Sequence, residues 1–171
     1  IYFYNKPIVI DENTDPTTLT NGAVCDVKFA REMTVANGIW NTIALPFSMT
    51  ANQIANTFGA GTRVAKLQST STVASQNAIN LVFAHVNEIE AGTPYIILPT
   101  ETGNGAIIES VTINTTENPV VIAGQVTMHP VLKTISYNYG NGDPIKFFLS
   151  ADGDLHYNEA SNSIKALRAY F

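Results

Sequence analysis

The sequence has little cysteine, little charge and no long apolar run, and each shortage excludes a class of structure or function. Cys25 is the only cysteine in 171 residues, so the chain forms no internal disulfide. It lies in an alternating stretch, where we expect a small buried apolar side chain rather than a nucleophile. No apolar run approaches the roughly 18 residues that a transmembrane helix needs, and we expect no membrane insertion by this segment.

Charged residues make up 13% of the chain, about half of the usual share. The 9 Lys and Arg residues are scattered, and the formal net charge is −5. Electrostatic binding of nucleic acid needs a clustered basic surface, so we expect no nucleic-acid partner. Thr and Asn, with 19 and 17 copies, supply the surface polarity instead. The branched side chain of Thr also favours strands.

Motifs for catalysis and for cofactor binding are missing from the sequence. It contains no nucleophile elbow, no phosphate-binding loop and no dinucleotide fingerprint, so we expect no cofactor and no enzyme activity. The histidines His85, His129 and His156 lie far apart, without the close spacing typical of metal ligands. Asp152 and Asp154 imitate part of a calcium loop, but a hairpin turn is the preferred interpretation and we expect no metal site.

A carbohydrate-active hydrolase is the alternative function. Such enzymes use two carboxylates about 5–10 Å apart in a cleft, and distant strands can bring such a pair together. Glu88 and Glu90 share one face of an extended segment, but they precede Ala91 and Gly92 and suit an exposed turn entry. We therefore interpret these two acids as solvated surface residues.

Turn signals and short apolar segments predict an all-β fold. Asn-Gly occurs four times and Asp-Gly once, and these dipeptides tolerate the positive φ that tight hairpin turns require. The segments between them are short and rich in β-branched or aromatic residues, and several alternate. They cover residues 23–30, 39–47, 78–86, 93–98, 109–115, 120–128, 145–150 and 164–171. We predict an antiparallel β-sandwich, of jelly-roll or immunoglobulin-like architecture.

One helix interrupts this pattern. Thr50 and Gln53 have the spacing of a capping box. The apolar residues that follow recur at helical spacing on one face, and Gly59 or Gly61 can end the helix. The sequence therefore predicts a short helix over 51–58.

The domain organisation is expected to be simple. Residues 1–22 read as a lead-in strand and loop, and residues 23–171 as a single β-sandwich domain. Because the sequence begins with Ile1, we expect a processed piece of a longer protein that carries other domains.

Aromatic and amide side chains are the candidates for ligand binding. Trp40 falls on the strand face opposite to the main apolar row, where it either packs on a second core face or forms a platform for a ligand. Tyr137 and Tyr139 flank a turn region that also holds Asn141 and Asp143. Exposed rings stack on the apolar faces of sugars, and Asn and Asp bind their hydroxyls. Core packing is the competing interpretation for all three rings.

Four segments carry a resemblance to a known family. They read GIWNTIALPFSM, FGAGTRVAKL, IEAGTPYIIL and FFLSADGDLHYNEASNSIKALRAYF, in that order. The chain from about Val24 to Phe171 resembles a recurrent β-rich domain of Bacteroidetes extracellular proteins, which often carry leucine-rich or other adhesin-type repeats elsewhere. Ile39, between Gly38 and Trp40, departs from the family pattern.

The resemblance implies export, an extracellular or cell-surface location and an accessory or adhesive role. It supplies no catalytic residues. We therefore expect a non-catalytic surface module that binds a glycan or a host surface protein, or that spaces other domains.

Overall fold

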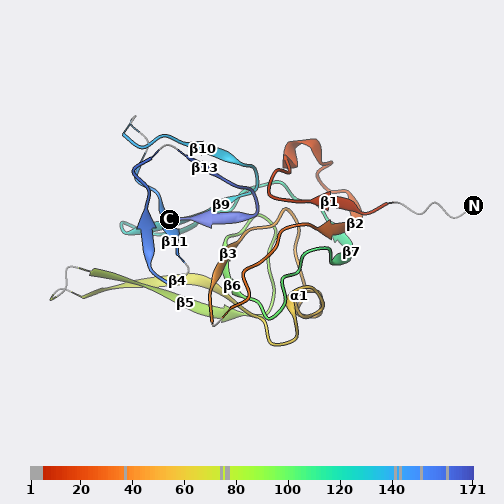
Figure 1. The fold of residues 1–171 in the computed structure, drawn as a ribbon, viewed down its shortest axis with the longest axis horizontal. Coiled ribbons are helices and arrows are strands. Elements are labelled where there is room, and N and C mark those ends of the chain that lie inside the picture. Colours follow the sequence, from red (N-terminus) through yellow and green to blue (C-terminus); the bar gives the residue numbers. More distant parts are fainter. Residues whose placement is uncertain are drawn as a thin grey trace, which may run out of the picture.

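The computed structural model describes residues 6–36, 38–73, 75, 78–140, 142, 144–150, 152–160 and 162–171. The described residues form strands in five sheets, one α-helix and one short 3-10 helix (Figure 1). All strand pairs but one are antiparallel; the exception joins the first two strands. The predicted all-β, sandwich-like fold with one short helix is confirmed.

The central sheet has the strand order β3-β6-β4-β5. Its strands are β3 (Asn41–Ile43), β6 (Tyr95–Leu98), β4 (Arg63–Val73) and β5 (Ala78–Val86). The hairpin of β4 and β5 is much longer than the other two strands, and it extends past the rest of the molecule in Figure 1. A bulge in β4 between Leu67 and Ser69 shifts its register with β5.

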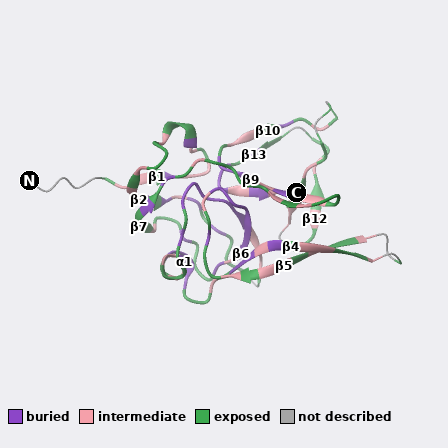
Figure 2. Ribbon diagram, turned by 180° about the vertical axis from the view of Figure 1, so that it is seen from behind, coloured by how far each residue is buried: buried purple, intermediate pink, exposed green. Residues whose placement is uncertain are grey.

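The inner part of this central sheet is buried on both faces. Val64 and Ile97 are cross-strand partners in one hydrophobic cluster, whereas their neighbours Ala65 and Ile96 belong to a second cluster on the opposite face. Successive side chains of a strand point to opposite faces, so two adjacent residues in each of these strands are apolar. In Figure 2 the buried residues gather at the centre, and the outer part of the β4–β5 hairpin is exposed or intermediate.

A three-stranded sheet and the helix cover the first face. The sheet contains β1 (Ile8–Ile10), β2 (Val24–Phe29) and β7 (Ile107–Thr112), with β1 parallel to β2. Ile10 is fully buried in the first cluster, so residues of the lead-in segment contribute to the core. The short 3-10 helix η1 (Pro16–Thr18) lies between β1 and β2.

The helix α1 (Ala51–Phe58) has the predicted bounds. The Thr50 hydroxyl accepts a hydrogen bond from the Gln53 amide, and the Gln53 side chain accepts one from the Thr50 amide, which completes the capping box. Ile54 and Phe58 pack in the first cluster. Among the described residues, no helix is long and apolar enough to span a bilayer.

The second face is covered by strands from the C-terminal half of the chain. The sheet of β8 (Val120–Ile122), β9 (Val126–Val131) and β14 (Arg168–Tyr170) has the order β14-β9-β8. Two antiparallel strand pairs lie beside it. One joins β10 (Ile135–Tyr137) to β13 (Asn162–Ile164), and the other joins β11 (Phe147–Leu149) to β12 (Leu155–Tyr157).

The segment 164–171 is not the single strand that the sequence pattern predicts. It contains the end of β13 and all of β14, separated by a turn in which Leu167 has φ 65°. The break lets Ala166 and Leu167 enter the first cluster, while Ala169 and Phe171 enter the second. One short segment therefore closes both hydrophobic cores.

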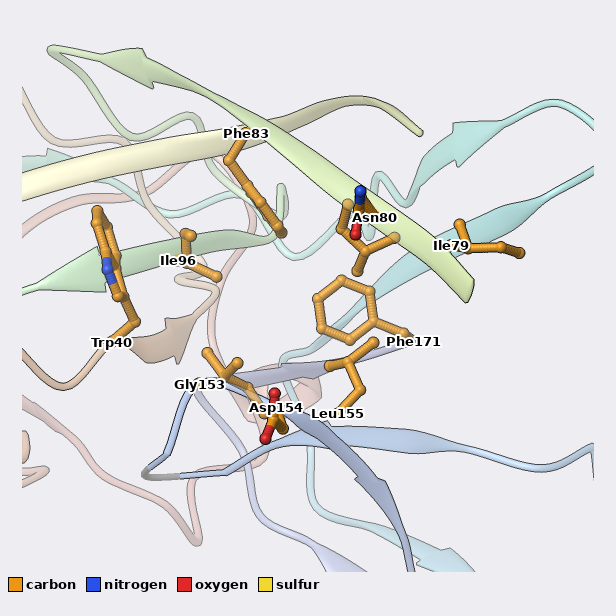
Figure 3. A pocket seen from close by; sticks show the side chains of 11 residues that line it. Trp40, Ile79, Asn80, Phe83, Ile96, Gly153, Asp154, Leu155 and Phe171 are labelled. Atoms are coloured by element: carbon orange, nitrogen blue, oxygen red, sulfur yellow. The ribbon is translucent and has the colours of Figure 1, made fainter. Parts of the chain in front are cut away.

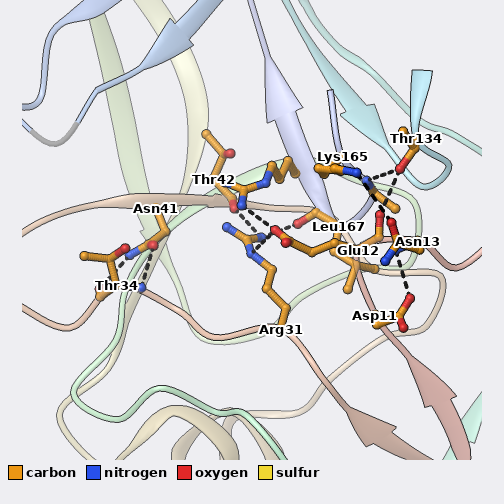
Figure 4. A network of polar contacts seen from close by, with 12 residues as sticks. Asp11, Glu12, Asn13, Arg31, Thr34, Asn41, Thr42, Thr134, Lys165 and Leu167 are labelled. Atoms are coloured by element: carbon orange, nitrogen blue, oxygen red, sulfur yellow. Dashed lines mark hydrogen bonds and ion pairs between the residues drawn. The ribbon is translucent and has the colours of Figure 1, made fainter. Parts of the chain in front are cut away.

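A buried arginine holds this break in place (Figure 4). Arg31 donates hydrogen bonds from Nη1 to the carbonyl oxygens of Thr42 and Leu167. Its Nε lies 3.7 Å from Glu12 Oε1 and makes no hydrogen bond. Glu12 also pairs with Arg168 of β14. The network thus joins the loop after β1 to the closing segment and fixes the position of β14.

Candidate functional site

The strongest candidate site is an open cleft between two hairpins. It has a volume of about 530 Å³ and lies between the β4–β5 hairpin and the turn of the β11–β12 hairpin (Figure 3). Apolar and aromatic side chains form most of the walls, as is typical of small-ligand sites. The lining residues are Trp40, Ile79, Asn80, Leu81, Phe83, Ile96, Leu149, Gly153, Asp154, Leu155 and Phe171.

Strand alternation explains why these residues face the cleft. Ile79, Leu81 and Phe83 share one face of β5, and all three line the site. On the other wall, Leu149 and Leu155 are cross-strand partners of the β11–β12 hairpin. Both walls pack against the second hydrophobic cluster, so the cleft is supported from below by the core.

Aromatic rings form the base of the cleft. Phe83 and Phe171 meet edge to face, with ring centroids 6.3 Å apart. Trp40 is half-buried against the second cluster, and the Cζ atom of Arg63 lies 5.4 Å from its ring centroid. The guanidinium over the indole is a cation–π contact, which orients the ring that enters the cleft.

The rings continue out of the cleft along the β11–β12 hairpin. The amide and carbonyl of Phe147 exchange hydrogen bonds of 2.7 and 2.9 Å with those of Phe171, so the two side chains share one face. Tyr157 is the cross-strand partner of Phe147, with ring centroids 5.9 Å apart. Tyr139 stacks on Tyr157 at 6.3 Å. We call Phe83, Phe171, Phe147, Tyr157 and Tyr139 the aromatic row.

The outer end of the aromatic row is open to solvent. Phe147 is 37% exposed and Tyr157 is 49% exposed. The Tyr157 hydroxyl donates to Glu159 Oε1 at 3.3 Å, and the charge of that carboxylate raises the pKa of Tyr157. Contiguous exposed apolar patches mark interaction sites, whereas singly scattered apolar residues do not, and the neighbouring rings of the row make it a candidate platform for a ligand.

The aromatic residues that the sequence suggested for ligand binding lie in different environments in the structure. Trp40 lines the cleft and Tyr139 belongs to the aromatic row. Tyr137 is only 1% exposed and packs against Phe148 in the interior. The core-packing interpretation therefore holds for Tyr137, because its position in β10 points the ring inward. Asn141 and Asp143 lie outside the described residues.

Sequence reasoning missed Phe83, Phe147, Tyr157 and Phe171. A signal for two of them was present, because the Asp-Gly pair at 152 centres a hairpin that places residue 147 opposite residue 157. The contribution of Phe171 depends on main-chain pairing with Phe147 across a long sequence separation. No local sequence pattern predicts such a long-range pairing.

The candidate metal residues lie in the turn of the β11–β12 hairpin. Asp152 and Asp154 are exposed, and the Ser150 amide donates to the Asp154 carbonyl at 2.9 Å. Their segment is the hairpin turn that the sequence favours. Within the described ranges, no group of three or more His, Cys, Asp or Glu residues could hold a metal ion. His129 instead stacks on Tyr170, with ring centroids 4.8 Å apart.

The candidate acid pair is on the surface. Glu88 and Glu90 are both exposed, and Glu90 Oε2 lies 3.1 Å from Lys66 Nζ. The Tyr95 hydroxyl is 3.4 Å from the same oxygen, and burial raises the pKa of Tyr95 to about 12. Among the described residues that line the cleft, Asp154 is the single carboxylate. The carboxylate of Asp154 can accept hydrogen bonds from a ligand in the cleft.

The described residues thus bring together an apolar cleft, a row of rings and one carboxylate, all on the second face of the molecule. Such a surface can hold a ligand that has both apolar faces and hydrogen-bond donors. Comparisons of the chain with protein-family models, with curated proteins and with solved structures found no match.

Proposed function

We propose that this chain is a non-catalytic module of a bacterial surface or secreted protein, and that it binds a glycan in the cleft and along the aromatic row. The single observation that carries the proposal is the aromatic row itself. Ring contacts join Phe83 to Phe171 and join Phe147, Tyr157 and Tyr139, and main-chain hydrogen bonds between Phe147 and Phe171 link these two groups. The row thus leads from the buried Phe171 to the exposed Tyr157.

The shape of the site suits a chain of sugars better than a compact ligand. Centroids of neighbouring rings in contact along the row are 5.9–6.3 Å apart. A pyranose presents C–H groups on one face, and these pack on the negative face of an aromatic ring. Several adjacent rings can therefore contact several successive sugars, and the open cleft admits the chain from the side.

The charges around the site favour neutral sugars. Asp154 lines the cleft, and Glu159 accepts the hydrogen bond of Tyr157 at the outer end. Carboxylates accept hydrogen bonds from sugar hydroxyls, whereas they repel the carboxylates or sulfates of acidic glycans. We expect neutral oligosaccharides to bind and acidic ones to bind weakly.

A glycan array followed by calorimetry tests the proposal. The unmodified chain should bind one or more neutral oligosaccharides, and Tyr157→Ala should lower the affinity by about tenfold or more, as expected for an exposed aromatic anchor. Val121→Ala is the matched control, because Val121 is 62% exposed on β8 and lies outside the cleft.

A Trp40→Phe variant separates the cleft from the outer row. It keeps a ring in the core but shortens the wall of the cleft. It should therefore lower the affinity for long oligosaccharides and leave the melting temperature nearly unchanged. The proposal fails if the array shows no binding, or if Tyr157→Ala and Trp40→Phe bind as tightly as the control. A chain that binds no glycan would then serve as a spacer or a protein-binding module.

A further inference from the structure

In the part of the chain that the structure describes, no strand pairs with the outer edge of β5. β5 is the last strand of the central sheet and pairs with β4 alone among the described elements. It has 9 residues, and its outer part extends past the body of the molecule (Figure 1). Each unpaired amide and carbonyl on such an edge can pair with another strand.

The edge lacks the features that usually protect against strand addition. Natural edge strands carry Lys, Pro or inward charges that block pairing. β5 contains no proline and no Asp, Glu, Lys or Arg. The whole stretch 67–84 is free of charged residues, although the chain has a net charge of −5. By contrast, the edge strand β7 contains Glu109.

Apolar side chains on both faces of β5 reach solvent. Ile79 is 55% exposed at the rim of the cleft, and Val82 is 39% exposed on the opposite face. Asn80 is also exposed, at the rim of the cleft, and it has the same strand parity as Val82. An added strand would cover these side chains and would also satisfy the edge amides and carbonyls.

We propose that β5 pairs antiparallel with β5 of a second copy of this chain, which joins the two central sheets into one. In a two-fold antiparallel pair, residue i of one strand faces residue j of the other, and only the residue on the two-fold axis faces its own copy. Val82 is the central residue of β5, so in a pair centred on the strand a charge at this position would face a like charge, which is destabilising. A charge-free strand avoids this penalty, and the donors and acceptors of an antiparallel edge complement themselves.

The distribution of charge favours a second copy over another partner. Two copies of net charge −5 repel each other. The outer part of the hairpin, within the uncharged stretch 67–84, projects from the body (Figure 1), so it is where two copies can approach with the least repulsion. A partner of opposite charge would find no Asp, Glu, Lys or Arg on β5 with which to form an ion pair.

The pairing has a consequence for ligand binding. Ile79, Leu81 and Phe83 of β5 form a wall of the cleft, so the dimer would place two clefts on one continuous sheet. Two linked sites raise the avidity for a repetitive ligand. The dimer itself is independent of the proposed glycan binding, because it rests on the strand edge alone.

Sedimentation equilibrium of the full chain over a range of concentrations tests the inference. The unmodified chain should form a dimer, and Val82→Lys should shift it to monomer by placing like charges in the pair. Asn80→Lys is a second variant, at an exposed position of the same strand parity. Val121→Lys is the control, since it adds the same charge at an exposed valine of β8. Circular dichroism should show the same fold for all four chains.

Hydrogen exchange identifies the interface. In the dimer the β5 amides should be protected, and in Val82→Lys they should exchange faster while those of β7 stay unchanged. A dissociation constant of about 1 mM corresponds to a marginal interaction. A chain that stays monomeric at about this concentration would overturn the inference. So would a dimer that survives both Val82→Lys and Asn80→Lys, or one that Val121→Lys abolishes.

Discussion

At the residue scale, Arg31 connects parts of the chain that are distant in sequence. Its guanidinium is 3% exposed and binds the carbonyls of Thr42 and Leu167. Burial lowers its pKa to about 9. Leu167 has a positive φ, which costs a non-glycine residue roughly 1–3 kcal/mol. The hydrogen bond from Arg31 and the bond of 2.7 Å from the Leu167 amide to the Val131 carbonyl hold this conformation.

Arg31→Ala should lower the free energy of unfolding by about 2–4 kcal/mol, because it removes a buried donor from two carbonyls and leaves Glu12 with Arg168 as its remaining cationic partner. Arg31→Lys should lower it less, since an ammonium can keep part of the charge pairing but cannot reproduce the planar fork. Urea unfolding measures both. Lys28→Ala, at an exposed position of β2, should change stability by less than about 0.5 kcal/mol. An Arg31→Ala chain as stable as this control would contradict the role given to Arg31.

At the element scale, η1 is held by an acidic cap. Asp15 Oδ1 accepts hydrogen bonds from the amide and hydroxyl of Thr17, and Oδ2 lies 2.6 Å from Lys133 Nζ. The hydrogen bond from Lys133 and those from Thr17 lower the pKa of Asp15 to about 2. The cap therefore joins η1 to the segment that follows β9.

The contribution of Asp15 to stability should depend on pH. Its pKa is lower in the folded chain than the ordinary value of 3.8, so the unfolded chain binds the proton more readily. The contribution is complete above about pH 4 and is lost as the pH falls toward about 2. Thermal melts of the unmodified chain and Asp15→Asn should differ at pH 7 and converge near pH 2. Thr18→Ala, next to the cap, should show no such convergence, and parallel curves for Asp15→Asn would contradict the assignment.

The elements differ in how far the sequence predicted them. α1 was predicted within its observed bounds, because the capping box and the apolar spacing act within the helix itself. The outer part of β4, with Ser69 and Thr72, shows no apolar alternation, since the hairpin there extends beyond the core and both of its faces are exposed or half-buried. The break at Leu167 was missed because the positive φ is imposed by Arg31 and Val131 from elsewhere in the chain.

At the scale of the whole molecule, the central sheet couples two hydrophobic clusters. Ile97 is fully buried in the first cluster, and Leu67 is 3% exposed in the second. They belong to the paired strands β6 and β4, so loosening one cluster removes support from the other. We expect the chain to unfold in one cooperative transition.

Ile97→Ala and Leu67→Ala test this coupling. Each should lower the free energy of unfolding by about 2–5 kcal/mol, as is usual for truncation of a large buried side chain. Trp40, the only tryptophan, reports on the second cluster by fluorescence, and circular dichroism reports on all strands. Both probes should give the same midpoint in both variants, and Val121→Ala should melt as the unmodified chain does. Separate midpoints for Ile97→Ala would mean that the clusters unfold independently.

The sequence alone determined the class of fold, the helix and the hairpin turns, because these depend on local backbone preference and on the alternation of apolar residues. Gly153, for example, has the positive φ that its Asp-Gly turn predicts. The tertiary structure decided which strands are neighbours, and therefore which rings meet. Tyr137 and Tyr139 are two residues apart, yet one is buried and the other joins the aromatic row. The pairing of Phe147 with Phe171 completes that row through main-chain hydrogen bonds, whose partners no local pattern specifies.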